Sequence, residues 1–234
     1  FDHKILQIID YETIYQKQKV VLITDGILDL KNFTKKGKIY YDNYSKTYKV
    51  TENRKNATYS AKESNIEINN LCKEEIENLT KDASLLSSIN HPYILKFIGY
   101  SSVNFDNIRK PVIITEYASN KTLEDLIDME REGIIIDGWN DTKKLINIFG
   151  IAYCMSFLHS HDIIHYNLKP SNIIMDENCH PKICGFGFYK QNLIKKCLEM
   201  QSVYNPKENF LYETPEVLNS CKFTKESDVY SFAF

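Results

Sequence analysis

The sequence contains no apolar run that approaches the roughly 20 residues needed to span a bilayer. It also lacks a signal peptide, and it begins at Phe1 instead of a methionine, so we expect a piece of a longer polypeptide. Its net charge of -2 gives no reason to expect nucleic acid or an anionic membrane as a partner. These absences favour a cytoplasmic protein that binds neither.

The six cysteines include no Cys-x-x-Cys pair. We therefore interpret them as free thiols in a reducing cytosol, with disulfides or a metal site as the alternatives. They are Cys72, Cys154, Cys179, Cys184, Cys197 and Cys221.

The sequence does contain a clear succession of periodic segments. From about Phe33 to Lys62 it is rich in Tyr, Thr and Val, which predicts strands, and a polar turn at 52–56 interrupts the pattern. Three- and four-residue steps predict a helix over 69–89, which His91-Pro92 ends. Further short strands are predicted at 94–99, 112–116, 173–175 and 181–184.

A second helix is predicted after Asn140, whose side chain suits a helix N-cap. Near its end, His159 and His161 are interpreted as surface or helix-end residues. One buried face is predicted, formed by Leu145, Ile148, Phe149, Ala152, Met155 and Leu158. Strands thus come first, then one helix, more strands and a mainly helical part, which indicates an α+β protein in two lobes.

Two nearby stretches carry motifs specific enough to indicate a family. Residues 165–172 read HYNLKPSN, and residues 181–187 read PKICGFG. Both the letters and the spacing resemble the H-R-D-L-K-P-x-N and P-K-I-x-D-F-G motifs of protein kinases. The style is closest to serine/threonine kinases of the tyrosine-kinase-like group, and the resemblance covers about Phe33 to Phe234.

The resemblance implies a small β-rich lobe with one αC-type helix, and a larger, mainly helical lobe that is incomplete. Residues 1–32 would be an extension or the end of a preceding module. The N-lobe would span 33–117 and the partial C-lobe 118–234, with an activation segment at about 185–216.

The resemblance also implies ATP and Mg²⁺ as cofactors and assigns residues to their binding. Lys62, at the end of a strand that resembles V-A-I-K, would contact phosphates, and Asp82 would be its acidic partner. Thr115 would be the gatekeeper before the hinge residues Glu116 and Tyr117.

Other matching positions concern packing. An apolar stack that joins the lobes would include Leu86, Phe97, His165 and Phe186, with Asp228 as its anchor. Glu216 corresponds to the last position of the A-P-E motif that ends the activation segment.

The chemistry-bearing positions depart from the family pattern. Asn167 stands where the catalytic base is an aspartate, and an amide cannot take a proton at neutral pH. Gly185 stands where an aspartate binds the metal, which leaves Asn172 as a weak neutral ligand for Mg²⁺. Lys169 is retained and matches the serine/threonine type of loop, while Tyr166 replaces the arginine that would pair with an activation-loop phosphate.

The phosphate-covering loop contains no glycine in either of two possible registers. The ungapped register places Tyr40, Asp42 and Ser45 at the glycine positions, and a shifted register places Asn43, Ser45 and Tyr48 there. Glycine lets the backbone approach phosphates closely, so this loop is poorly suited to cover them. The ungapped register also puts Thr47 and Ser60 where apolar residues usually cover the adenine.

Three hypotheses follow. The first is a catalytically impaired pseudokinase that acts through protein partners as a signalling scaffold or allosteric regulator. The second is a weakly active serine/threonine kinase or an ATP-binding module, based on Lys62, Lys169 and Asn172. The third is a piece without stable function on its own, because the chain stops at Phe234.

Overall fold

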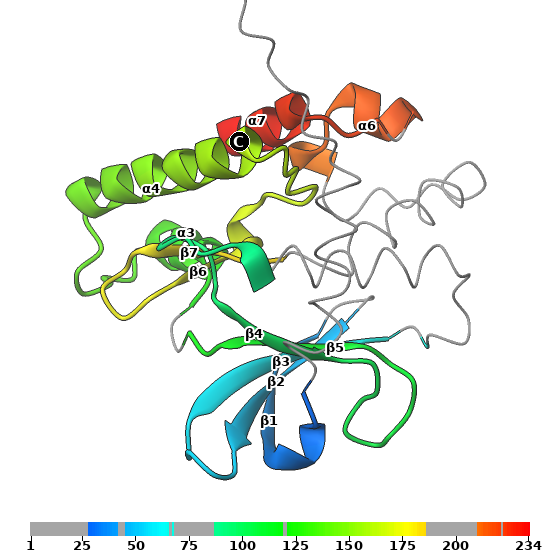
Figure 1. The fold of residues 1–234 in the computed structure, drawn as a ribbon. Helices are drawn as coiled ribbons and strands as arrows, with labels where there is room; N and C mark the ends of the chain where they lie inside the picture. The colour runs from blue at the N-terminus through cyan, green and yellow to red at the C-terminus, as the bar shows by residue number, and fades with distance from the viewer. Residues whose placement is uncertain are drawn as a thin grey trace, which may run out of the picture.

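The computed structural model describes residues 28–41, 45–65, 67, 87–118, 121–185, 210–220 and 222–234. They form two lobes, with a five-stranded sheet at the bottom of Figure 1 and helices at the top. The predictions for Asp82, Leu86 and Phe186, for most of residues 1–32 and for nearly all of the helix over 69–89 lie outside the described residues. The α+β architecture in two lobes is confirmed.

The sheet of the N-lobe is antiparallel throughout, in the order β1-β2-β3-β5-β4. Its strands are β1 (Phe33–Tyr41), β2 (Ser45–Glu52), β3 (Thr58–Ser64), β4 (Phe97–Ser101) and β5 (Val112–Glu116). The predicted strands up to Lys62 and the turn after Glu52 are confirmed. The strand predicted at 94–99 starts three residues later, because Ile94 instead bridges to Ile183 in the C-lobe.

One face of this sheet encloses an apolar core. Four residues are fully buried there: Val50 of β2, Ala61 of β3, and Val112 and Ile114 of β5. The short 3-10 helix η1 (Leu30–Asn32) adds Leu30 to the cluster. In β5, Val112 and Ile114 belong to this core, whereas Ile113 and Thr115 lie on the other face of the sheet, which turns toward the C-lobe.

The C-lobe is built around a long helix and a two-stranded sheet. Its elements are α3 (Leu123–Arg131), α4 (Asp141–Ser160), η3 (Pro170–Asn172), β6 (Ile173–Met175), β7 (Pro181–Ile183), η4 (Phe210–Tyr212), α6 (Pro215–Ser220) and α7 (Lys225–Ala233). The Asn140 side chain accepts a hydrogen bond from the Lys143 N–H, so the predicted N-cap of α4 is confirmed.

The predicted apolar face of α4 is partly wrong. Met155 and Leu158 are buried, but Leu145, Ile148 and Phe149 are 53%, 52% and 66% exposed. The buried positions instead follow the series Asn147, Gly150, Ile151, Cys154, Met155 and Leu158. Gly150 fixes this orientation, because Pro181 and Tyr93 come so close that a Cβ atom would lie 3.1–3.3 Å from them.

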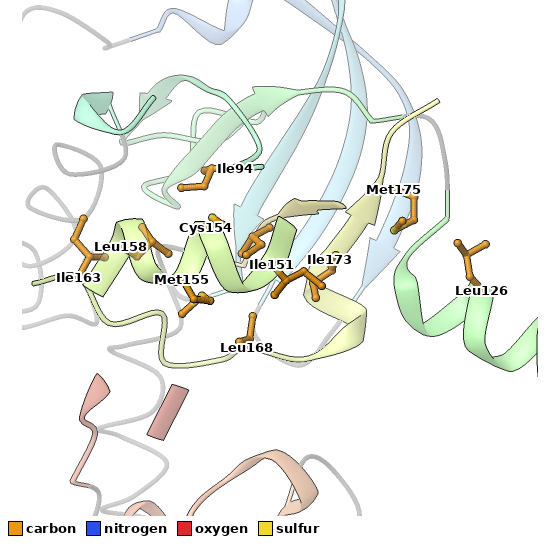
Figure 2. Packing of buried hydrophobic residues seen from close by; sticks show 11 residues of the cluster. Ile94, Leu126, Ile151, Cys154, Met155, Leu158, Ile163, Leu168, Ile173 and Met175 are labelled. Carbon is orange, nitrogen blue, oxygen red and sulfur yellow. The ribbon is translucent and has the colours of Figure 1, made fainter. Parts of the chain in front are cut away.

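The face of α4 that points inward packs on β6, β7 and the loop before them. Figure 2 shows this cluster, in which residues of α4 lie beside Ile173 and Leu168, while Met175 lies toward Leu126 of α3. Leu126 of α3 joins from the side, and Ile94 reaches in from the N-lobe chain. The core thus sets the loop 165–172 on a rigid support.

Among the described helices, none is long and apolar enough to cross a membrane.

Candidate functional site

A cleft of about 350 Å³ lies between the sheet and the C-lobe. The sheet contributes Ile39, Tyr40, Thr47, Ser60, Lys62, Phe97, Ile113 and Thr115. The other wall comes from the start of α3, from the end of η3, from β6 and from the residues after β7, and includes Asp125, Asn172, Ile174, Cys184 and Gly185. Chain segments far apart in sequence therefore meet around one cavity, as ligand sites typically require.

The β-strand register places the sheet side chains in the cleft. Ser60 lies opposite Thr115 across β3 and β5, and Thr47 lies opposite Lys62 across β2 and β3. Side chains at opposed positions share one face, so all four reach the same cavity. Tyr40, Thr47 and Ser60 line it, as the ungapped register expects.

Thr115 lines the cleft, whereas the two residues predicted to follow it in the hinge, Glu116 and Tyr117, are not among the lining residues. The Glu116 carboxylate accepts a hydrogen bond from the Lys96 N–H (3.1 Å) and lies 3.3 Å from the Lys182 Nζ atom. The Tyr117 ring lies 4.6 Å from the Lys49 Nζ atom. Both side chains therefore hold the hinge to neighbouring segments and do not face the cavity.

His165 is buried next to Cys184, a residue of the cleft lining, and is held in one tautomer. Its Nδ1 atom accepts from the Asn167 N–H (3.2 Å), so Nε2 carries the proton and donates to the Cys184 carbonyl (2.9 Å). Burial lowers the pKa of His165, and the nearby Lys62 ammonium acts in the same direction. A neutral imidazole thus joins the loop 165–172 to the chain after β7.

Asp228 of α7 anchors the same loop. Its buried carboxylate accepts hydrogen bonds from the N–H groups of His165 (2.8 Å) and Tyr166 (3.1 Å). It also meets the His159 Nε2 atom at 3.0 Å. The contact of His159 was not foreseen from the sequence, although its place directly after the buried Leu158, in the last turn of α4, is a signal for it.

Tyr166 adopts a left-handed backbone conformation, with φ of 71°, which is uncommon for a residue that is not glycine. Its ring makes an edge contact with Phe223, with the ring centroids 5.4 Å apart. An aromatic contact therefore stands where the resemblance would place an arginine and a phosphate.

Asn167, Asn172 and Gly185 lie together where the loop 165–172 meets the chain after β7. The Asn172 Nδ2 atom donates to the Asn167 carbonyl (2.7 Å), and the Cys184 N–H donates to the Asn172 carbonyl (2.9 Å). Gly185 has φ of 94°, and a Cβ atom added there would lie 2.8 Å from the Asn172 Cγ atom. The amide of Asn172 thus fills the space beside Gly185.

This group of residues does not fit Mg²⁺, which requires several hard oxygen ligands. Gly185 has no side chain, and Asn167 and Asn172 supply only neutral amides. The cleft carboxylate of Asp125 accepts from the Thr122 N–H and hydroxyl (both 2.8 Å) in the capping box of α3. Throughout the described part of the chain, no three His, Cys, Asp or Glu side chains form a group that could hold a metal.

Other predicted residues lie at the edges of the site or away from it. Lys169 is the N-cap residue of η3, and its carbonyl accepts from the Asn172 N–H (2.9 Å). Glu216 is exposed on α6. Lys121, Asp125 and Cys184 line the cleft although they were not predicted to do so. Cys184 could have been found, because it directly precedes Gly185 in the recognised motif.

A two-lobed fold with a cleft between the lobes, and a loop anchored by a buried aspartate beneath it, defines the class of kinase-like proteins. The sequence model of the family described as Protein kinase domain matches residues 33–234. The chain therefore belongs to the protein kinase family, whose members generally bind ATP and Mg²⁺.

Curated relatives agree with this family. The chain is 31% identical over 167 residues to calmodulin-binding receptor-like cytoplasmic kinase 3 of Arabidopsis thaliana, which is 68% of this chain and 31% of the relative. It is 30% identical over 147 residues to human NUAK family SNF1-like kinase 1, which is 63% of this chain and 20% of the relative. It is 27% identical over 164 residues to the mouse serine/threonine-protein kinase TNNI3K, which is 69% of this chain and 18% of the relative. The chain thus spans a third or less of the length of these relatives.

Proposed function

We propose that this chain is a catalytically impaired kinase domain of the serine/threonine type, a pseudokinase that acts through protein partners as a signalling scaffold or allosteric regulator. The observation that carries the proposal is the end of the cleft, where Asn167 and Gly185 take the places of two aspartates and the Asn172 amide packs against Gly185. Loss of a general base alone costs roughly 10²- to 10⁴-fold in rate.

The retained packing supports a role that depends on shape. His165, Cys184 and Asp228 are linked by hydrogen bonds between protein groups that hold the loop in place. A surface held this firmly can present a constant face to a partner protein, because partners bind pre-organised surfaces at lower entropic cost.

Phosphoryl transfer tests the proposal directly. The protein is incubated with radiolabelled ATP, Mg²⁺ and a mixture of protein substrates, beside the Lys62→Met variant as control. We expect incorporation equal to that of the variant. Incorporation that exceeds it reproducibly means that the chain is an active kinase, and the proposal then fails.

A second candidate is a weakly active serine/threonine kinase or an ATP-binding module. It is favoured by Lys62 and Asn172, which both line the cleft. A thermal shift titration with ATP, with and without Mg²⁺, distinguishes it. A rise in melting temperature that Lys62→Met abolishes supports nucleotide binding, and no shift at millimolar ATP excludes this candidate.

A further inference from the structure

We propose that Asn172 and Gly185 form a latch that closes the cation position from within, so that a carboxylate restored at residue 185 does not recreate a Mg²⁺ site. The inference rests on the proposed function and extends it. The proposed function rests in part on the loss of one metal ligand, the aspartate replaced by Gly185. The inference adds that packing between Asn172 and Gly185 fills the position of the metal.

Asn172 is held in place by three hydrogen bonds, two of its backbone and one of its side chain. Its own N–H donates to the Lys169 carbonyl, its carbonyl accepts from the Cys184 N–H, and its Nδ2 atom donates to the Asn167 carbonyl. The two backbone bonds fix the Cα atom, and the third fixes the carboxamide. Turning the amide away from Gly185 therefore breaks its 2.7 Å hydrogen bond to the Asn167 carbonyl, which costs stability.

Gly185 completes the latch because it has no side chain. An added Cβ atom would lie 2.8 Å from Cγ of Asn172 and 3.0 Å from each of its Nδ2 and Oδ1 atoms. A Cβ atom essentially never lies that close to another heavy atom, so either the amide or the backbone must shift. Any residue other than glycine is also strained at φ of 94°.

The latch joins two segments that a shared cation would otherwise connect. One is the loop up to Asn172, and the other is the chain at Cys184 and Gly185. Because hydrogen bonds and close packing provide the connection here, the geometry of the cleft does not depend on divalent cations.

A double-mutant cycle tests the close packing. Melting temperatures are measured for wild type, Gly185→Ala, Asn172→Ala and the double variant. We expect each single change to lower the melting temperature by about 3 °C or more. We expect the double variant to melt above the additive value, because Asn172→Ala removes the three atoms that the new Cβ atom would meet. Additive losses overturn the inference.

Gly133→Ala provides the matched control. Gly133 has a similar backbone conformation, with φ of 74°, but an added Cβ atom meets nothing within 4 Å. The change therefore introduces the backbone strain without the collision. Its effect should add to that of Asn172→Ala without coupling, which separates the latch from a general cost of alanine at positive φ.

The metal is tested with Gly185→Asp and the wild type in EDTA and in millimolar MgCl₂ at equal ionic strength. We expect no rise in melting temperature on adding Mg²⁺ to either protein. A rise of about 2 °C or more for Gly185→Asp overturns the inference. If that variant does not fold, the alanine cycle decides alone.

Phosphoryl transfer is measured separately, so an active enzyme contradicts the proposed function while additive losses contradict the latch.

Discussion

At the scale of single residues, Asp228 has the largest role in holding the site. Its carboxylate is 2% exposed and accepts hydrogen bonds from the N–H groups of His165 and Tyr166, with His159 as a third neighbour. Hydrogen bonds to a charged group are stronger than those between neutral groups, and burial removes the competition from water. The charge therefore fixes the backbone of the loop from a separate helix.

Replacing Asp228 with asparagine should lower the free energy of unfolding by about 3 kcal/mol, because an N–H group would then face backbone N–H donors. Urea denaturation followed by circular dichroism measures the change. Asp128→Asn is the control, since Asp128 is exposed and pairs with Arg131 on the surface of α3, and it should leave stability unchanged. Equal midpoints for the two variants would contradict the role assigned to Asp228.

At the scale of elements, the orientation of α4 decides which of its apolar residues stabilise the fold. Leu158 is fully buried among residues of β6, β7 and the loop, whereas Leu145, more than three turns earlier in the helix, is 53% exposed. Both belong to the face predicted from the sequence. The structure therefore separates two leucines that the hydrophobic pattern treats alike.

Leu158→Ala should cost about 3 kcal/mol of stability because it leaves a cavity in the core. The same change at Leu145 should cost less than about 0.5 kcal/mol, as is usual for surface positions. Chemical denaturation of the two variants at equal protein concentration makes the comparison. A loss at Leu145 as large as that at Leu158 would contradict this orientation of α4.

The same helix shows what could be read from the sequence and what could not. The Asn140 cap, the strands of the N-lobe and the loop motif follow from local chemistry or from spacing, and the structure agrees with them. The face of α4 was misjudged because two overlapping stripes fit a period of 3.6 residues. The true stripe includes Asn147 and Gly150, which are buried only because distant residues pack against them. The latch at Gly185 was equally hidden, since it depends on a contact with Asn172.

At the scale of the whole molecule, two buried histidines make stability depend on pH. His165 lies beneath the cleft, and the His91 ring stacks on Phe157 of α4 with the centroids 4.8 Å apart. Burial lowers the pKa of both groups below the ordinary value of 6.5. Below pH 6.5 the unfolded chain then binds more protons than the folded one, so stability is lost as the pH falls.

We expect the melting temperature to fall steadily between pH 7 and pH 5.5. His91→Phe keeps a ring for stacking but cannot take up a proton, so its curve should fall less steeply. The lowered pKa values of the exposed Glu130, Asp162 and Glu226 start from 4.5 or 3.8 and act at lower pH. Calorimetric scans across this range measure the slopes, and parallel curves for wild type and variant would show that His91 is not responsible.

Cys184 gives this molecule an internal reporter. Its backbone is hydrogen-bonded on one side to Asn172 and on the other to the His165 ring, and the residue belongs to the lining of the cleft. Burial raises the pKa of the thiol to about 11, so little of the reactive thiolate is present at neutral pH. The rate at which a small alkylating reagent modifies this one cysteine therefore measures how often the loop and the strand separate. A partner protein that tightens or loosens the cleft can be detected by that rate without any assay of catalysis.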